Sequence, residues 1–228
     1  MSTFTFQKLQ YYKRVLVRAC SCSYYNRFPK PLVNNVIDEH RIQKQNWMEM
    51  EKEGRPEFTQ KHYDKSAQTK LDSIDFFPGQ CLEIGCESGW FGQRVLEKYP
   101  AAKYVGVDFR YEEITAPSLP GHYVINGDAC RLPLKKNTMD LLIGFHVLEH
   151  LRDIKGFAGE LDRVLKDDAK VLFCVPIGWD DDPCHRWHFM TAAGWKRFIM
   201  RRFGLRQVSH VRISHEPGEY MGLFERAR

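Results

Sequence analysis

The residues best suited to chemistry follow short apolar stretches of the chain. In the segment Glu83–Gly89, Gly85 permits a tight turn and Gly89 lets the chain approach a ligand where a helix begins. Asp108 ends a second apolar stretch, 19 residues after Gly89, and Asp128 follows a third. An acid at the first spacing accepts hydrogen bonds from ribose hydroxyls, and the second can accept from an adenine amino group. The pattern predicts a nucleoside-binding site.

The glycine spacing also distinguishes between nucleoside ligands. A dinucleotide site needs G-x-G-x-x-G, so that the backbone can meet a pyrophosphate. Here Glu87 stands at the second glycine position and Trp90 at the third. A carboxylate would repel phosphate, which disfavours nicotinamide and flavin dinucleotides. S-adenosylmethionine has no phosphate and has an ammonium group that tolerates a nearby acid, so we expect this cofactor.

Alternating strands and helices must position these residues. Ligands of parallel α/β sheets bind at the carboxyl ends of the strands, where the candidate residues lie. We therefore expect an α/β fold with a Rossmann-like, mostly parallel sheet, helices on both faces and a C-terminal antiparallel hairpin. The expected strands are 80–85, 103–108, 122–127, 139–146 and 170–176, the helices 90–99, 147–166 and 191–202 (N-cap Thr191), and the hairpin strands 207–213 and 220–225.

Four segments, taken in order, are similar to the motifs of class I methyltransferases of the type 11 family. Glu83–Gly89 resembles their E/D-x-G-x-G-x-G motif, with Glu87 in place of a glycine, and 104–108, 127–133 and 140–151 resemble the next three. The resemblance covers residues 79–228 and implies an S-adenosylmethionine-dependent enzyme. It implies a methionine end lined by Glu83, Gly85, Cys86 and Gly89, a ribose held by Asp108, an adenine beside Phe109, Asp128 and Ala129, and a sulfonium above Phe145 and His146.

The acceptor side is expected between the fifth strand and the last helix. His146, His185 and His188 are candidate general bases, because unperturbed histidine titrates near pH ~6.5. Trp179, Trp187 and Phe189 could stack on a sugar or another flat ring.

Two patterns suggest a metal, but we assign no metal ligands. Cys184 with His185 and His188 lacks a second ligand pair at finger-like spacing. The segment His146–His150 spells H-x-x-E-H, an inverted zinc-protease motif, yet it begins at a strand end inside the methyltransferase pattern.

Charge and cysteine content suggest organisation and partners. The net charge of +5 is segregated: residues 1–37 hold six bases and no acid, and residues 185–228 hold nine bases and three acids. We expect a basic, partly helical extension or lid over 1–70 and a methyltransferase domain over 71–228. The basic arm could contact an anionic membrane surface. Seven cysteines, an odd number, and the lack of a signal sequence favour a cytoplasmic protein.

The predicted function is S-adenosylmethionine-dependent methyl transfer to a hydroxyl or carboxylate of a small molecule or glycan, with an anionic acceptor favoured. The alternatives are an RNA-directed methyltransferase and, because of Glu87, a non-catalytic S-adenosylmethionine-binding protein. Residues 145–148 lack the N-P-P-Y-type loop of base-amino methyltransferases, so nucleic acid is the less favoured partner.

Overall fold

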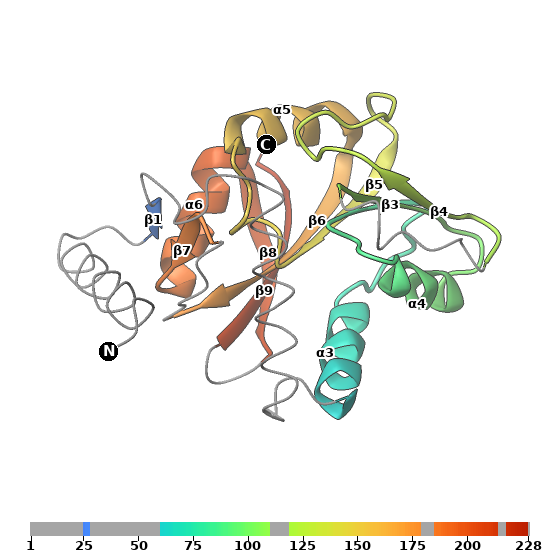
Figure 1. The fold of residues 1–228 in the computed structure, drawn as a ribbon, viewed down its shortest axis with the longest axis horizontal. Helices are drawn as coiled ribbons and strands as arrows, with labels where there is room; N and C mark the ends of the chain where they lie inside the picture. The colour runs from blue at the N-terminus through green and yellow to red at the C-terminus, as the bar shows by residue number, and fades with distance from the viewer. Residues whose placement is uncertain (1–24, 28–59, 110–118, 179–184, 214–217, 228) are drawn as a thin grey trace, which may run out of the picture.

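The computed structural model describes residues 25–27, 60–109, 119–178, 185–213 and 218–227 (Figure 1). The elements run in the order β1 (Tyr25–Arg27), α3 (Gln60–Asp72), β2 (Gln80–Ile84), α4 (Trp90–Lys98), β3 (Lys103–Asp108), β4 (His122–Asn126), β5 (Met139–Phe145), α5 (Ile154–Val164), β6 (Leu165–Ile177), β7 (Trp187–Phe189), α6 (Ala192–Phe203), β8 (Leu205–Arg212) and β9 (Gly218–Arg226).

Seven strands form one sheet in the order β4-β3-β2-β5-β6-β9-β8. The first five pair in parallel, while β9 pairs antiparallel with both β6 and β8. This confirms the predicted Rossmann-like sheet and its C-terminal hairpin. The strand order reverses at β2, so the segments after β2, β3 and β5 leave the same edge of the sheet at its switch point, where such folds bind ligands.

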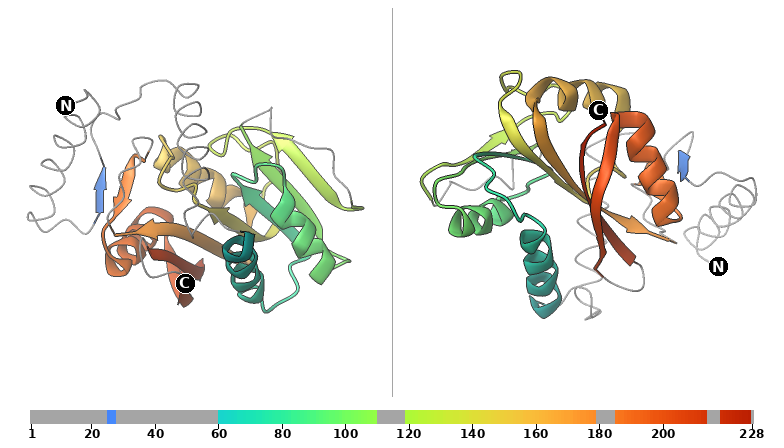
Figure 2. Two further views of the ribbon diagram at one scale, coloured as in Figure 1. Left: turned by 60° about the horizontal axis from the view of Figure 1, so that its bottom comes forward. Right: turned by 180° about the vertical axis from the view of Figure 1, so that it is seen from behind.

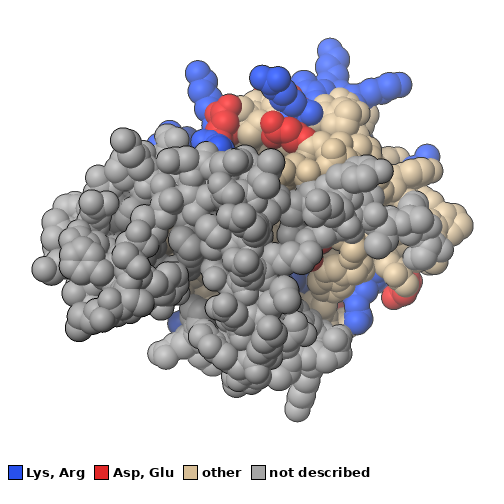
Figure 3. Space-filling view, viewed as in Figure 1, with Lys and Arg blue, Asp and Glu red and all other residues tan. Residues whose placement is uncertain are grey.

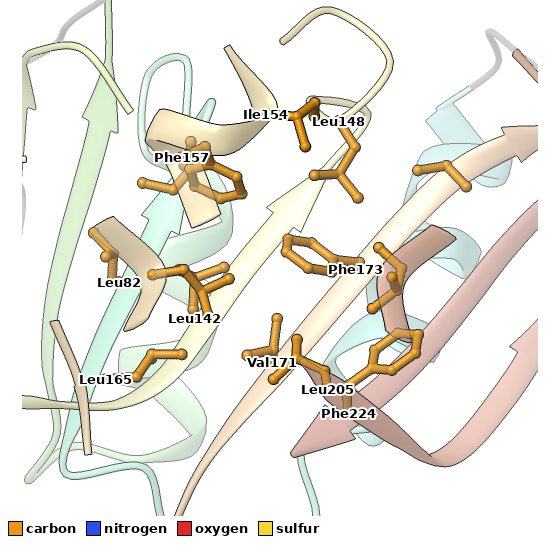
Figure 4. Packing of buried hydrophobic residues seen from close by; sticks show 14 of the residues in the cluster. Leu82, Leu142, Leu148, Ile154, Phe157, Leu165, Val171, Phe173, Leu205 and Phe224 are labelled. Carbon is orange, nitrogen blue, oxygen red and sulfur yellow. The ribbon is translucent and has the colours of Figure 1, made fainter. Parts of the chain in front are cut away.

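Helices cover both faces of the sheet, because successive strand residues point to opposite sides. On one face Leu142 and Phe173 pack with Phe157 of α5 (Figure 4), and Trp195 of α6 belongs to the same buried cluster. On the other face a second buried cluster joins the sheet to α4 and to the end of α3; its members are Leu71, Ile74, Cys81, Phe91, Val95, Leu96, Ala102, Tyr104, Leu141, Ile143, Leu172, Cys174, Met221 and Leu223.

One helix begins later than its apolar pattern predicts. The expected helix over 147–166 is observed only over Ile154–Val164, because residues 147–152 form turns and bends after β5. Asp153 caps the helix by accepting a hydrogen bond from the Gly156 N–H at 2.8 Å. The last helix begins as predicted, with the Thr191 hydroxyl accepting from the Gly194 N–H at 3.0 Å.

The N-terminal part of the chain reaches the domain at two places. β1 pairs antiparallel with β7, and the two strands lie side by side in Figure 2. Helix α3 runs across the predicted boundary at residue 70. Within the described ranges, no helix combines the length and hydropathy that a bilayer crossing needs.

Candidate functional site

The turn between β2 and α4 contains three residues in the left-handed region of backbone space. These are Gly85 (φ 71°), Glu87 (φ 51°) and Gly89 (φ 76°). A Cβ on Gly89 would stand 2.7 Å from Cγ2 of Val124, so that glycine is sterically required. Glu87, which replaces the motif's second glycine, adopts the conformation that a glycine would take there at lower cost.

Asp108 connects the end of β3 to this turn. Its side chain is 3 % exposed, and Oδ2 accepts a 2.9 Å hydrogen bond from the Glu87 N–H. The next residue, Phe109, is 51 % exposed. The structure thus brings together the turn and the acid that the sequence predicts to hold a ribose, with an exposed ring beside them.

Glu83 is a buried acid at the end of β2, beneath the turn. It is 4 % exposed and accepts a hydrogen bond from the hydroxyl of Tyr104. Burial raises the pKa of Glu83 to about 8, even though the Tyr104 hydrogen bond lowers it. Cys86, also predicted to lie here, is a buried free thiol whose pKa burial raises well above its usual value.

Asp128 and Ala129 follow β4 on the same edge of the sheet. Oδ1 of Asp128 accepts a 2.8 Å hydrogen bond from the Cys130 N–H, which closes an Asx turn. Ala129 is partly buried against the core. Their predicted role at an adenine remains a prediction.

The end of β5 carries Phe145 and His146. The Phe145 ring centroid lies 5.0 Å from that of Phe91. Nζ of Lys70 lies 4.8 Å from the Phe145 centroid. His146 has φ 52°, a strained conformation for a residue with a side chain. Such outliers are concentrated at functional sites.

Two carboxylates hold His146. Its Nε2 lies 3.2 Å from Oε1 of Glu219 and its Nδ1 lies 3.4 Å from Oε1 of Glu149, while 37 % of the side chain remains exposed. Burial favours the neutral ring, but the contacts with Cys174, Glu149 and Glu219 outweigh it and raise the pKa of His146 well above its usual value.

Helix α3 delivers two polar groups that sequence reasoning missed. The hydroxyl of Ser66 donates to Oε2 of Glu219 at 3.2 Å, and Nζ of Lys70 lies 3.8 Å from the same oxygen. Burial opposes the charge of Glu219, but His146 and Lys70 lower its pKa to about 2. The partners lie about 150 residues apart, and no local pattern could have indicated their contact.

A cavity of about 320 Å³ opens beside this carboxylate, between the end of β6, the start of β9 and the first turn of α6. Arg212, Glu219 and Tyr220 line it, together with Ile177, Gly178, Met190, Thr191, Ala192 and Gly218. Its volume falls at the lower end of the range for small-molecule sites. Glu219 also contacts His146, so the cavity lies next to His146 at the end of β5.

The aromatic residues of the predicted acceptor loop mostly belong to the core. Trp187 is 5 % exposed and Phe189 is 2 % exposed, and their ring centroids lie 5.0 Å and 5.2 Å from that of Phe198. The prediction that these two rings stack on a sugar is therefore wrong, because β7 turns them inward. Trp179 lies outside the described residues.

The three candidate histidines occupy different environments. His188 is 3 % exposed, and its Nε2 lies 3.2 Å from the carbonyl oxygen of His185. His185 is half-buried. Of the three, His146 contacts the cavity wall, through Glu219.

Among the residues that the structure describes, two groups of side chains have the residue types and the proximity to hold a metal ion. The ligand atoms of His146, Cys174 and Glu219 lie within 4.8 Å of one another, as do those of Glu149, His150 and His185. The two histidines of the H-x-x-E-H segment thus fall into different groups, which does not match a zinc-protease arrangement.

Comparisons with known proteins find similarity to methyltransferases. The family model described as a methyltransferase domain matches residues 82–173. The malonyl-[acyl-carrier protein] O-methyltransferase of Gallionella capsiferriformans is 28 % identical over 115 residues, which is 46 % of this chain and 40 % of the relative. The chain spans less than half the length of the curated relatives that it matches.

Solved structures show the same fold. A SAM-dependent methyltransferase from Aquifex aeolicus aligns with a TM-score of 0.61 and 16 % identity, over 82 % of this chain and 97 % of its own. The 1,6-didemethyltoxoflavin-N1-methyltransferase of Burkholderia thailandensis, solved with S-adenosylhomocysteine, aligns with a TM-score of 0.65 and 12 % identity, over 90 % of this chain and 95 % of its own.

Proposed function

The chain belongs to the class I, S-adenosylmethionine-dependent methyltransferases, and we propose that it transfers a methyl group to an oxygen of an anionic small molecule or glycan. The observation that supports this most is the contact between His146 and Glu219. It joins the end of β5, predicted to face the sulfonium, to the wall of the 320 Å³ cavity.

The cofactor residues fit the proposed ligand. The turn after β2 offers acids and glycines but no cation for a phosphate, which matches a nucleoside with an amino-acid end. Asp108 would hold the ribose, and Glu83, Gly85, Cys86 and Gly89 would line the methionine end. S-adenosylmethionine supplies an electrophilic methyl group when bound, so the protein's main task is to position the acceptor oxygen.

Charge at the cavity favours an anionic acceptor. Arg212 lines the cavity, and so do Thr191 and Ala192 at the start of α6. The positive end of a helix dipole and a guanidinium both stabilise a nearby anion. Glu219 also lies in the wall, but its charge is offset by Lys70 and His146.

Of the two oxygen acceptors, we place carboxylates first, because an ionised carboxylate needs no base. A hydroxyl would need one, and His146, the candidate histidine that adjoins the cavity, has a raised pKa that keeps its ring protonated and unsuited to that role near neutral pH. The relative named malonyl-[acyl-carrier protein] O-methyltransferase supports an oxygen acceptor. The N1-methyltransferase named above shows that the fold also serves nitrogen acceptors.

The test is methyl transfer from labelled S-adenosylmethionine to matched carboxylate, hydroxyl and amine acceptors. We expect base-labile methyl esters or stable ethers, and Arg212→Met should raise the Michaelis constant for anionic acceptors at least fivefold while leaving that for the cofactor unchanged. Lys196→Met, an exposed change on α6 that does not line the cavity, is the matched control.

Other outcomes would replace this proposal. Label found only on amines contradicts oxygen transfer, and label found on RNA supports the RNA-directed alternative. Cofactor binding without turnover on any acceptor supports a non-catalytic S-adenosylmethionine-binding protein.

A further inference from the structure

Beside the proposed methyl-transfer site, Glu149 is a buried carboxylate whose oxygens lack hydrogen bonds. The side chain is 0 % exposed, and neither Oε1 nor Oε2 makes a hydrogen bond of acceptable geometry with any residue that the structure describes. Among the described residues, His146 lies 3.4 Å from this carboxylate, and the nearby His150 and His185 help to lower its pKa against the opposing effect of burial. Burying a carboxylate without hydrogen bonds is costly unless a cation compensates for its charge.

Two imidazoles stand next to this carboxylate. One ring nitrogen of His150, one ring nitrogen of His185 and one carboxylate oxygen of Glu149 all lie within 4.8 Å of one another. The ring centroids of His150 and His185 are 4.6 Å apart, with their planes at 73°. Edge-to-face rings let one nitrogen from each converge on a point between them.

The main chain holds the two contributing segments together. The carbonyl oxygen of Glu149 accepts hydrogen bonds from the N–H groups of Arg186 (2.7 Å) and Trp187 (3.1 Å). The indole N–H of Trp187 donates to the carbonyl oxygen of Leu151 at 3.0 Å. The loop after β5 and the segment before β7 are thus fixed to each other on either side of the three ligand atoms.

From these contacts we propose that Glu149, His150 and His185 bind one divalent transition-metal ion, with zinc the best match. Two imidazoles and one carboxylate form a donor set typical of zinc sites that keep open coordination positions. Zinc–ligand bonds of about 2.0–2.2 Å place the ligand atoms about 3–4 Å apart. Small rotations of the side chains would bring the three ligand atoms from their present separations to these distances. Magnesium and calcium prefer all-oxygen sites and do not fit.

The neighbouring group of His146, Cys174 and Glu219 is the weaker candidate. His146 and Glu219 already pair at 3.2 Å, and Ser66 and Lys70 bind the second carboxylate oxygen. Both oxygens of Glu219 in that group therefore have partners within the protein, whereas the oxygens of Glu149 have no hydrogen bonds from the described residues.

The open positions of the proposed ion would take an oxygen ligand. His146 lies between this site and the cavity, with one ring nitrogen toward Glu149 and the other toward Glu219. An oxygen donor on the ion, either water or an acceptor group, would therefore lie next to the place proposed for methyl transfer.

The experiment is zinc binding to the tag-free full chain after treatment with a chelator. Isothermal titration with Zn²⁺ measures stoichiometry and affinity, and the visible spectrum after Co²⁺ substitution reports nitrogen–oxygen coordination without any need for activity. We expect one ion per chain. His150→Ala, His185→Ala and Glu149→Gln should each weaken binding at least tenfold, whereas His210→Ala, which changes an exposed histidine stacked on Tyr220, should not.

Folding of each variant is checked by circular dichroism, and the two half-buried histidines keep the test decisive if Glu149→Gln does not fold. The proposal is overturned if no stoichiometric binding occurs, or if the His150→Ala/His185→Ala double variant binds like the wild type. It is also overturned if Cys174→Ser abolishes binding while the His150 and His185 variants do not, because the ion would then belong to the neighbouring group.

Discussion

The N–H of Glu87 donates a 2.9 Å hydrogen bond to Oδ2 of Asp108, which links the turn after β2 to the acid at the end of β3. The residue that departs from the glycine motif is therefore part of the geometry that holds the proposed ribose ligand. A left-handed conformation aims this N–H at Asp108, so Glu87 and Asp108 should be tested in parallel.

Replacing Asp108 should weaken cofactor binding. Asp108→Ala removes the proposed bonds to the ribose, so affinity for S-adenosylhomocysteine should fall by roughly 1.5–3 kcal/mol, the range for hydrogen bonds to charged groups. Calorimetric titration measures the change. Asp162→Ala, an exposed acid that pairs with Arg226, is the control and should bind as the wild type does. Equal binding by the Asp108 variant would remove this residue from the site.

Glu87→Gly should stabilise the fold and change the affinity for the cofactor only slightly. The left-handed conformation costs a residue with a Cβ about 1–2 kcal/mol, partly offset by the entropy of glycine, so we expect a gain of up to about 1 kcal/mol. The affinity should stay within about tenfold, or 1.4 kcal/mol, because the ligand's ammonium offsets the carboxylate. Denaturant unfolding and calorimetry measure the two effects. A hundredfold gain in affinity would instead mark Glu87 as the cause of a degenerate site.

Gly89→Ala should destabilise the protein by about 2 kcal/mol or more, because the new methyl group adds a clash to a left-handed backbone. That methyl group would lie 2.7 Å from Val124 and 2.9 Å from His122. The matched control is Gly159→Ala, where an added Cβ meets nothing within 4 Å on helix α5. It should stabilise by about 0.5–1 kcal/mol through helix propensity. Urea unfolding measures the change in unfolding free energy, which should be negative for Gly89→Ala and positive for Gly159→Ala.

Glu83 should make stability fall as pH rises. Burial raises its folded-state pKa from 4.5 to about 8, so the folded protein holds a proton that the unfolded chain releases. Its stabilising effect is complete below pH 4.5 and is lost as pH rises through 8. The slope is on the order of 1.4 kcal/mol per pH unit for one proton.

Glu83→Gln removes this titration and can still accept from Tyr104. The difference in unfolding free energy between variant and wild type should therefore grow in the variant's favour from pH 5.5 to pH ~8. A constant difference across that range would show that Glu83 ionises normally in the folded protein.

The basic chain ends should accelerate encounter with an anionic acceptor. On the face in Figure 3, Lys and Arg side chains of the described residues stand out at the top, in the region of α5, and their charge adds to that of the chain ends. Deleting residues 1–22 removes four of the six bases in the acid-free arm and keeps β1. The acceptor's Michaelis constant should rise and become less salt-sensitive, since the Debye length falls from about 10 Å at 0.1 M to about 3 Å at 1 M salt.

Binding to anionic phospholipid vesicles distinguishes membrane anchoring by the arm from electrostatic steering of the acceptor. If the deletion changes only vesicle association, the arm anchors the protein to a membrane surface. If it changes neither measurement, the charge segregation is only a solvated surface and the steering prediction fails.

Much of the fold was predictable because its determinants are local. Apolar runs, glycines at turns and acids after strands indicated β2, β3, β5 and the hairpin within a residue or two, and they placed Gly85, Gly89 and Asp108 at one edge of the sheet. The start of α5 was missed, because the apolar pattern continues through turns that only the capping by Asp153 distinguishes from helix.

The sequence by itself determined the sheet, its switch point and the placement of the residues proposed for the nucleoside side of the site, since each depends on residues close together in the chain. Only the tertiary structure decided the surroundings of the proposed acceptor side. It turned Trp187 into the core, brought Glu219 to His146 across 73 residues, and set His185 against Glu149 and His150. Those contacts depend on how β7, β9 and the loop after β5 pack, and packing between distant segments leaves no periodic pattern in a single sequence.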